Sequence, residues 1–381
     1  MNLRWPGGCG LLLIGLVVGC DGGAGQSQPK SADDKATVGT AAVAMATAES
    51  APSAPPATQV IALPGTPPGV GFDDLRFVAF PDSFSAILAP AGRTGNVDFI
   101  DPASGKVTSL GGFSVDGAFG GGHDFGVTSA DGGFDGLFAL DRTSKKLHLA
   151  DPIKKQIVGS VGLAASPDYV RYFMPFRQAW VTEPDAEQIE VFDMPKVGTM
   201  DAAFVGGGAP VKSATITVKG GPESLVFDVK RSRAYSNLWT RSTVSIDMSE
   251  NKVVATWPNG CQKSRGIDLH EDILFVGCAE GKVSALDAAS GKLLGSLETK
   301  GEGVDILAFA PGLRHVYVPS SKAGSVAVVG VTAKGELSLL GSLPAAVGAH
   351  CVAADKNGYA YVCDPQRGAI LKIKDPYPAT R

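Results

Sequence analysis

The feature that most constrains the fold is a short unit that repeats along the chain. The turn "DPASGK", which begins at Asp101, returns as "DAASGK" at Asp287, and "STVSIDMSENK" from Ser242 occupies the same place in a third copy. Each copy places this turn between two short apolar strands, and two further strands joined by a hairpin precede it. Four short strands in a repeat of roughly 40 to 45 residues are typical of one β-propeller blade. The 49 glycines also favour a turn-rich β protein.

The number of blades follows from one position in the repeat. A titratable residue stands two positions before the small apolar core of each first strand, at intervals of 40 to 55 residues. These residues are Arg76, His123, Asp168, Glu223, Arg265, Asp305 and His350. The longest interval contains an insertion between Asp193 and Val211. Seven starts predict an all-β, seven-bladed β-propeller over residues 58–381.

The last unit ends after its third strand, "GAILKIK". The segment Thr58–Gly65, "TQVIALPG", precedes the first blade and is similar to the strands that close the other units. We therefore expect it to supply the fourth strand of the last blade, because pairing the two ends of the ring removes exposed sheet edges. The alternative is that this segment continues the linker before it.

The N-terminus has the pattern of an export signal. Residues 1–19 contain one arginine and an apolar run from Leu11 to Val18 that is too short to span a bilayer. The following "VVGC" resembles the bacterial lipobox, which implies lipidation at Cys20. An ordinary secretory signal cleaved nearby is the alternative.

A linker follows the signal. Residues 20–57 consist largely of alanine, glycine, serine, proline and threonine without hydrophobic periodicity, so they cannot bury enough surface to fold. As a flexible coil they would average roughly 30 to 35 Å end to end. We interpret them as a tether that holds the propeller away from a membrane.

Four cysteines lie beyond Cys20 and form two candidate disulfides. Counting back from a hairpin at Lys356–Gly358 places Cys351 opposite Cys363. Cys261 and Cys278 lie toward the same face of blade five, so a second bridge is expected there. The C-x-x-C spacing of a four-cysteine metal site is absent, and we expect no metal.

The seven blade starts are the candidate binding residues. In a propeller the innermost strands line the central channel, so Arg76, His123, Asp168, Glu223, Arg265, Asp305 and His350 are expected at one channel mouth. A self-neutralising structural ring, a ligand site and a catalytic site all fit this pattern. Loops after the second strands add Arg93, Arg142, Arg241 and Arg367, whose guanidinium groups suit carboxylates. Both histidines are expected to change charge between pH 5 and 8.

Other chemistry is not indicated. The net charge of −4 is spread without basic blocks, which gives no footprint for nucleic acid. The sequence lacks a C-x-x-C-H haem motif and a G-x-S-x-G hydrolase motif, and the glycines of Gly117–Gly126 have no strand-loop-helix context. No cofactor is therefore expected.

The segments "HVYVPSSKAGSVAVVGV" (His315–Val331) and "YAYVCDPQRGAILKI" (Tyr359–Ile373) carry a family resemblance. They are similar to the bacterial YVTN-type seven-bladed propellers, which are related to surface-layer propellers and to the amine dehydrogenase heavy-chain fold. The name-giving tetrapeptide is replaced by Val-Tyr-Val-Pro and Ala-Tyr-Val-Cys. The resemblance covers residues 58–381 and implies the fold more than an activity.

Together these observations predict a lipid-anchored bacterial envelope protein, periplasmic or on the outer surface, whose propeller binds or scaffolds a protein, peptide or glycan. The alternative is a propeller enzyme, such as a lactone hydrolase or a redox subunit of the dehydrogenase type, with no catalytic residue assigned. An enzyme should place one histidine within hydrogen-bond reach of a carboxylate beside a deep pocket. A scaffold should present a broad, shallow face.

Overall fold

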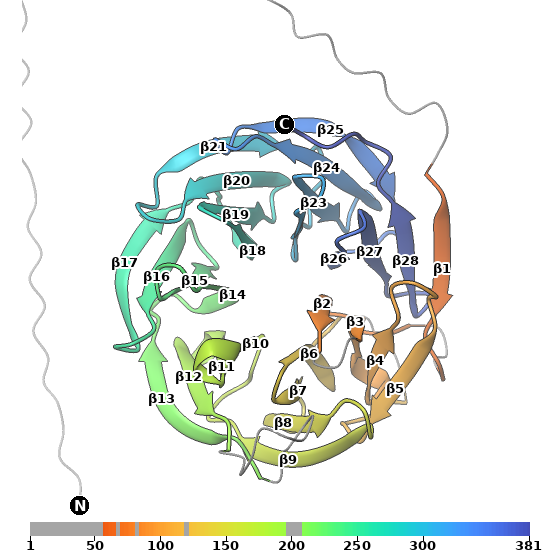
Figure 1. Ribbon diagram of the computed structural model, residues 1–381, viewed down its shortest axis with the longest axis vertical. Helices are drawn as coiled ribbons and strands as arrows, with labels where there is room; N and C mark the ends of the chain where they lie inside the picture. The colour runs from red at the N-terminus through yellow and green to blue at the C-terminus, as the bar shows by residue number, and fades with distance from the viewer. Residues whose placement is uncertain (1–55, 66–68, 81–83, 118–121, 196–207) are drawn as a thin grey trace, which may run out of the picture. The chain divides into compact units, whose positions relative to one another are not determined.

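The computed structural model describes residues 56–65, 69–80, 84–117, 122–195 and 208–381. Within these ranges the chain forms seven four-stranded antiparallel sheets arranged in a ring (Figure 1). The all-β, seven-bladed propeller predicted from the repeats is thus confirmed. The signal residues 1–19, Cys20 and nearly all of the tether lie outside the described residues. No helix of the described part has the length and hydropathy needed to cross a membrane.

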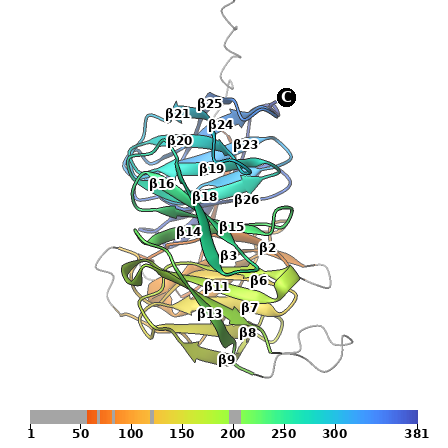
Figure 2. The same cartoon turned by 90° about the vertical axis from the view of Figure 1, so that its left-hand side faces the viewer.

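Each blade runs from an innermost strand beside the central axis to an outermost strand on the rim (Figure 1), and Figure 2 shows the same ring from its edge. The strands of blades one to four are β2 (Arg76–Ala79), β3 (Ser85–Ala91), β4 (Asn96–Ile100), β5 (Val107–Gly111); β6 (Val127–Gly133), β7 (Gly136–Asp141), β8 (Lys146–Asp151), β9 (Gln156–Gly162); β10 (Val170–Phe173), β11 (Gln178–Glu183), β12 (Gln188–Asp193), β13 (Val211–Thr217); β14 (Pro222–Asp228), β15 (Arg233–Leu238), β16 (Ser242–Asp247) and β17 (Lys252–Pro258).

The strands of blades five to seven are β18 (Ser264–His270), β19 (Ile273–Cys278), β20 (Lys282–Asp287), β21 (Leu293–Glu298); β22 (Ala308–Ala310), β23 (His315–Ser320), β24 (Ser325–Val331), β25 (Leu337–Pro344); β26 (Val352–Ala354), β27 (Tyr359–Asp364), β28 (Ala369–Lys374) and β1 (Thr58–Ala62). Short 3₁₀ turns occur at η2 (Gly92–Thr94), η3 (Met174–Phe176) and η4 (Pro184–Ala186). The predicted insertion of blade three falls between β12 and β13.

The repeated Asp-x-x-Ser-Gly-Lys turns have a common physical cause. In the first copy an Asp101 carboxylate oxygen accepts hydrogen bonds from the backbone N–H of Ala103 at 3.0 Å and of Ser104 at 2.6 Å. The next residue, Gly105, has a φ of 73°, which favours glycine. In the later copy Asp287 accepts from the Ser290 N–H at 2.8 Å, and Gly291 has a φ of 70°. The aspartate and the glycine therefore fix the turn between the third and fourth strands.

The two ends of the propeller are joined by strand pairing, as predicted. Strand β1 pairs antiparallel with β28 from Thr58 opposite Ile373 to Ala62 opposite Ala369. Side chains alternate along β1, so Ile61 is buried with 5% exposure while Val60 is 51% exposed. Ile61 belongs to a core cluster shared by blades one and seven, so the strand closes the ring both by hydrogen bonds and by apolar packing.

Candidate functional site

The innermost strands define two ends of the ring axis. We call the end at which these strands begin the upper end, and the end at which they turn into the hairpins to the second strands the lower end. At the upper end the loops that enter the blades converge with the loops after the second strands. The sequence-predicted site is located there.

Two ion-pair groups form the upper end. The Nδ1 atom of His123 lies 3.0 Å from Oδ1 of Asp73, and its ring centroid lies 5.1 Å from that of His350. On the other side of the axis, Nε of Arg265 lies 3.7 Å from a Glu223 carboxylate oxygen. These side chains come from the starts of blades one, four, five and seven and from the loop before blade two.

Arg142 is the centre of the first group. Its guanidinium contacts Asp73 at 3.2 Å and Asp124 at 2.8 Å, forms a further ion pair with Asp168, and donates from Nε to the Pro167 carbonyl at 2.8 Å. The residue lies in the loop after β7 and reaches across to the entrance of blade three. It therefore joins three blades through one side chain.

Arg76 does not join the other six predicted residues. It is the first residue of β2, and its Nε lies 3.7 Å from Oδ1 of Asp131. Comparison of "DDLRF" with "DYVRY" explains the difference, because Asp73 aligns with Asp168 and Arg76 aligns with Arg171. Asp73 thus occupies the place in blade one to which we had assigned Arg76.

His123 reaches the site from a loop. It lies four residues before β6, and not at the start of the strand. The loop approaches blade one closely at Gly71, where a Cβ atom would lie 2.8 Å from the Gly122 carbonyl oxygen and 3.2 Å from the His123 Cα. The missing side chain at Gly71 therefore permits the contact between His123 and Asp73.

Two of the other three loop arginines have structural contacts, and the third is exposed. Arg93 donates to the Gly69 carbonyl oxygen at 2.9 Å and 2.7 Å. Arg367 pairs with Asp364 three residues before it, and Arg241 is exposed. Of the four arginines singled out in these loops, Arg142 is the one whose ion pairs reach the upper-end carboxylates.

Burial and neighbouring charge shift the titration of the site. The Asp73 carboxylate raises the pKa of His123 to about 9. Burial, reinforced by the negative charge of Asp73, raises the pKa of Asp168 to about 8. Burial also raises the pKa of Glu223 and of Asp305. Burial alone would raise the pKa of Asp73 as well, but Arg142 and His123 outweigh it and lower that pKa. At neutral pH the first pair is therefore an imidazolium and a carboxylate.

A pocket of about 460 Å³ opens beside these groups. Its charged lining consists of His123, Arg265, Asp305 and His350. Both ring nitrogens of His350 face carbonyl oxygens, those of Gly348 and Phe72, each at 2.7 Å. Carbonyl oxygens only accept, so both nitrogens of this ring are directed at acceptors. Basic groups thus outnumber carboxylates in this pocket.

A second pocket, of about 410 Å³, lies on the blade-three side of the same end. It is lined by Arg142 and Asp168 together with the exposed side chains of Asp124 and Trp239. The Arg265 guanidinium carbon lies 5.8 Å from the centre of the Trp239 ring, so the two pockets are connected by a cation–π pair.

We call the pocket of about 460 Å³ beside His123 the upper pocket. Three of its residues have the composition of a metal site. His123, Asp305 and His350 each offer one atom within 4.8 Å of the others. A metal needs a neutral imidazole nitrogen with a free lone pair. His350 uses both nitrogens toward carbonyl oxygens, and His123 directs Nδ1 at Asp73. The contacts of this trio are those of a charge network.

Both predicted cysteine pairs are brought to disulfide distance beside the site. The Cα atoms of Cys261 and Cys278 are 5.2 Å apart, and those of Cys351 and Cys363 are 5.7 Å apart. The pairing of Ala353 with Tyr361 confirms the register used to predict the second bridge. Cys351 directly follows His350 in the chain, so this bridge fixes the backbone that carries the histidine.

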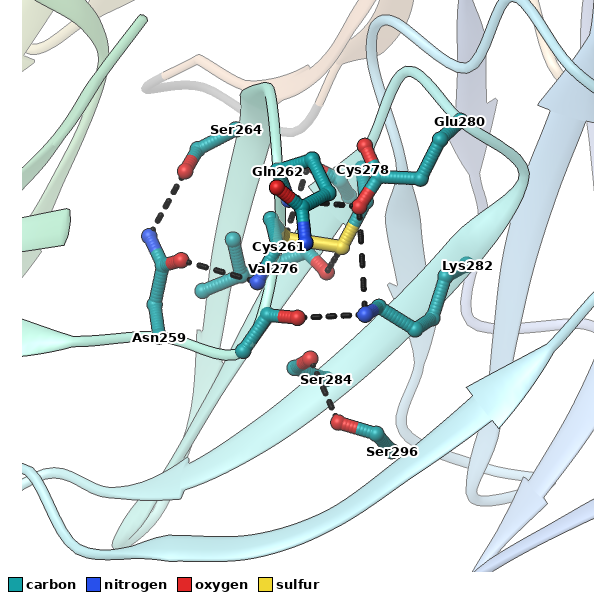
Figure 3. The surroundings of a disulfide bond; sticks show 12 residues. Asn259, Cys261, Gln262, Ser264, Val276, Cys278, Glu280, Lys282, Ser284 and Ser296 are labelled. Atoms are coloured by element: carbon teal, nitrogen blue, oxygen red, sulfur yellow. Dashed lines mark hydrogen bonds and ion pairs between the residues drawn. A yellow bond between two sulfur atoms is a disulfide. The ribbon is translucent and has the colours of Figure 1, made fainter. Parts of the chain in front are cut away.

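The first bridge joins the loop before β18 to the end of β19 (Figure 3). Asn259 donates to the Ser264 hydroxyl at 2.7 Å and accepts from the Cys261 N–H at 3.1 Å. Glu280 accepts from the backbone N–H of Gln262 at 2.6 Å. The disulfide and these polar contacts together order the start of β18, from which Arg265 extends.

Comparisons with known proteins establish the fold. No family model matches this chain, and no curated protein sequence matches it. Among solved structures, a chain of a mitotic checkpoint complex superposes with a TM-score of 0.66 at 14% identity, covering 87% of this chain and 98% of that one. Hydrazine synthase of Kuenenia stuttgartiensis gives 0.62 at 15% identity, covering 82% and 99%. U3-55K gives 0.65 at 14% identity, covering 84% and 100%. At these identities the likeness shows a propeller fold alone, and the YVTN-type resemblance stays a prediction.

Proposed function

We propose that this protein is a lipid-anchored propeller of the bacterial envelope that binds a carboxylate-bearing protein or peptide partner at its upper end. The observation that carries the proposal is the pocket formed by His123, Arg265 and His350. Three basic side chains face one half-buried carboxylate there, Asp305, whose pKa is raised by desolvation. A carboxylate entering the pocket would accept charge-assisted hydrogen bonds from Arg265 and from Nε2 of His123, because both ring nitrogens of His350 already face carbonyl oxygens.

The fold and the neighbouring surface support a protein partner. Propellers are commonly protein-binding scaffolds, and one similar structure is a chain of a mitotic checkpoint complex. Trp239, which is 46% exposed, and Arg265 lie between the two upper pockets. Tryptophan and arginine are enriched among the residues that dominate binding energy at protein interfaces. A glycan is the remaining partner class predicted from the sequence, and it would use the same aromatic surface.

The partner test begins with a pull-down from the native envelope using the anchored protein. Affinity for the captured partner is then measured for Arg265→Ala, His350→Ala and Glu223→Ala variants that melt like the wild type. We expect the first two to weaken binding at least tenfold. Arg233→Ala is the matched control, because that arginine pairs with Asp247 on another part of blade four. Unchanged affinity in all three site variants would show that binding lies elsewhere.

The pH dependence gives a second test. An anionic group binds best while His123 is protonated and Asp168 is neutral. With pKa values of about 9 for His123 and about 8 for Asp168, affinity should fall as the pH rises from 7 to 10. This window is higher than the range of pH 5 to 8 expected from histidine alone. Constant affinity across it would exclude the upper pocket as the carboxylate site.

The anchor is tested separately. Replacing Cys20 by alanine should move the protein from the detergent phase to the aqueous phase in a phase partition of the envelope fraction. If the wild type is also found in the aqueous phase, the lipid anchor is wrong, while the partner site is unaffected by that outcome.

A hydrolase is the second candidate function, because the contact of 3.0 Å between His123 and Asp73 beside a pocket of about 460 Å³ is the geometry expected of an acid–base pair. With a pKa of about 9, His123 would act as a proton donor at neutral pH. A panel of lactones and esters assayed with the wild type and with His123→Gln would decide. Hydrolysis that is lost in the variant would favour the enzyme over the scaffold.

A further inference from the structure

A pocket of about 260 Å³ lies at the lower end of the ring axis. Innermost strands of blades one and three to seven contribute to it, and Pro311 and Lys356 of the hairpins after β22 and β26 complete its outer edge. Among the described residues, its lining shares no member with the pocket beside His123. The two ends of the axis therefore carry separate sites.

Arg171 is buried in the wall of this lower pocket, with its side chain 6% exposed. Its Nη1 and Nη2 atoms donate to the Asp74 carboxylate at 2.6 Å and 3.2 Å, and Nη1 also donates to the Val170 carbonyl at 2.8 Å. Its Nε–H has no hydrogen-bond partner among the described residues. A buried guanidinium donor without an acceptor costs free energy that a bound acceptor would recover.

Arg76 adds a second open donor. Its Nε is buried and also lacks a hydrogen-bond partner among the described residues. The nearest ion-pair contact, to Asp131, is 3.7 Å long, which is beyond a hydrogen bond. Asp131 instead accepts from the Tyr172 N–H at 2.9 Å and from the Gly132 N–H at 2.9 Å. The Arg76 side chain, which is 37% exposed, therefore lines the pocket with an Nε–H that has no hydrogen-bond acceptor among the described residues.

Asp268, which also lines this pocket, has its hydrogen-bonding needs met by the backbone. One carboxylate oxygen accepts from the Leu269 N–H at 2.8 Å and the other from the Phe309 N–H at 2.8 Å. Burial raises its pKa, which reduces its negative charge near a bound anion. The Asp268 carboxylate is thus already engaged by backbone donors and not by the arginines.

Three further polar residues line the pocket: Ser224, Lys356 and Asp355, whose carboxylate accepts from the backbone N–H of Asn357 at 2.8 Å and of Tyr359 at 2.9 Å. The remaining wall is apolar and includes Leu75, Phe77, Ile267, Ile306, Phe309 and Val352. Pockets for drug-sized ligands occupy about 300–1,000 Å³, so the lower pocket suits a smaller molecule. Its ligand needs an acceptor group at one end and a short apolar body.

We propose that the lower pocket binds a small monocarboxylate with a short aliphatic chain. The carboxylate pairs with the guanidinium groups of Arg76 and Arg171, which line the pocket, and the chain packs on the apolar part of the wall. This site is independent of the partner site at the upper end.

Hexanoate is the probe that tests the proposal. It is titrated into the purified full-length protein by isothermal calorimetry, with hexanol and hexylamine as chain-matched compounds that lack the carboxylate. We expect saturable binding of hexanoate, and binding of hexanol and hexylamine at least tenfold weaker. Equal binding of hexanol would show that the pocket selects only for apolar surface, and absence of hexanoate binding would overturn the proposal.

Variants assign the binding to this pocket. Arg76→Gln should weaken hexanoate at least tenfold, while Arg265→Gln at the upper end should leave it unchanged. Ala354→Phe, which narrows the pocket from β26, should also abolish binding and provides a second variant if Arg76→Gln does not fold. Hexanoate binding that survives both Arg76→Gln and Ala354→Phe, in proteins that melt like the wild type, would refute the assignment.

Discussion

Ring closure by β1 can be tested with two substitutions on neighbouring positions of one strand. Ile61 is buried against the cluster that joins blades one and seven, whereas Val60, one residue earlier, faces outward with 51% exposure. Truncation of a buried isoleucine to alanine costs about 2–5 kcal/mol. A surface truncation usually changes stability by less than about 0.5 kcal/mol. We therefore expect Ile61→Ala to lower the free energy of unfolding by about 2–5 kcal/mol, and Val60→Ala to leave it nearly unchanged.

The assay is urea denaturation followed by tryptophan fluorescence, which reports on Trp180 of blade three and on Trp239 and Trp257 of blade four. A shift for Ile61→Ala seen in a probe so far along the chain would show that opening the closure weakens the whole ring. Deletion of Thr58–Gly65 should cost more than either substitution and promote aggregation, because it exposes the edge of β28. Deletion of Gly25–Ala51 within the tether should do neither. Equal midpoints for Ile61→Ala and Val60→Ala, or for the two deletions, would refute closure by β1.

Three further predictions concern the stability of the upper end: an arginine substitution, a pH dependence and a disulfide. Arg142→Met should lower the free energy of unfolding by about 3–5 kcal/mol, because it leaves buried carboxylates without their cation, and Arg142→Lys should fall between that variant and the wild type. The melting temperature should fall between pH 6.5 and 9: the stability from His123 is complete below its unfolded pKa and is lost as the pH rises through about 9, and Asp168, with a pKa of about 8, acts in the same direction. The variant His123→Gln should show a smaller fall of the melting temperature over this pH range. An unchanged fall would show that His123 is not the group responsible. Non-reducing peptide mapping should show Cys351 linked to Cys363, and replacing both by serine should cost about 3 kcal/mol; free thiols in the native protein would contradict the bridge.

The fold was accessible from the sequence because its determinants are local and repeated. The turn at Asp101 needs an aspartate oxygen and a glycine at fixed spacing, and both recur at Asp287. The orphan strand at Thr58 was predictable for a different reason, since the last blade lacks a strand that only the other end of the chain could supply. The Cys351–Cys363 register followed from counting outward from a tight hairpin.

The site was harder to predict from the sequence, because it depends on contacts between side chains of different blades. Arg142 was visible as a loop arginine, but its contacts with Asp73 and Asp168 belong to two other blades. Asp73 was hidden by the choice of register, although the shared spacing of an aspartate and an arginine in "DDLRF" and "DYVRY" contains the signal. His123 was found at a position that is not a strand start, and its place depends on the approach permitted by Gly71.

The backbone around the upper pocket is held in place by hydrogen bonds between neighbouring blades, which affects the entropy lost on binding. The Gly266 N–H donates to the Asp305 carbonyl at 2.7 Å, and the Ile306 N–H donates to the His350 carbonyl at 3.0 Å, so the starts of blades five, six and seven are joined by backbone hydrogen bonds. The two cysteine pairs brace the flanking blades, five and seven. Because the charged groups are already held in place, little ordering entropy is lost when a carboxylate binds. Under the proposed function, the disulfides would contribute to affinity through the geometry of Arg265 and His350, in addition to stabilising the propeller.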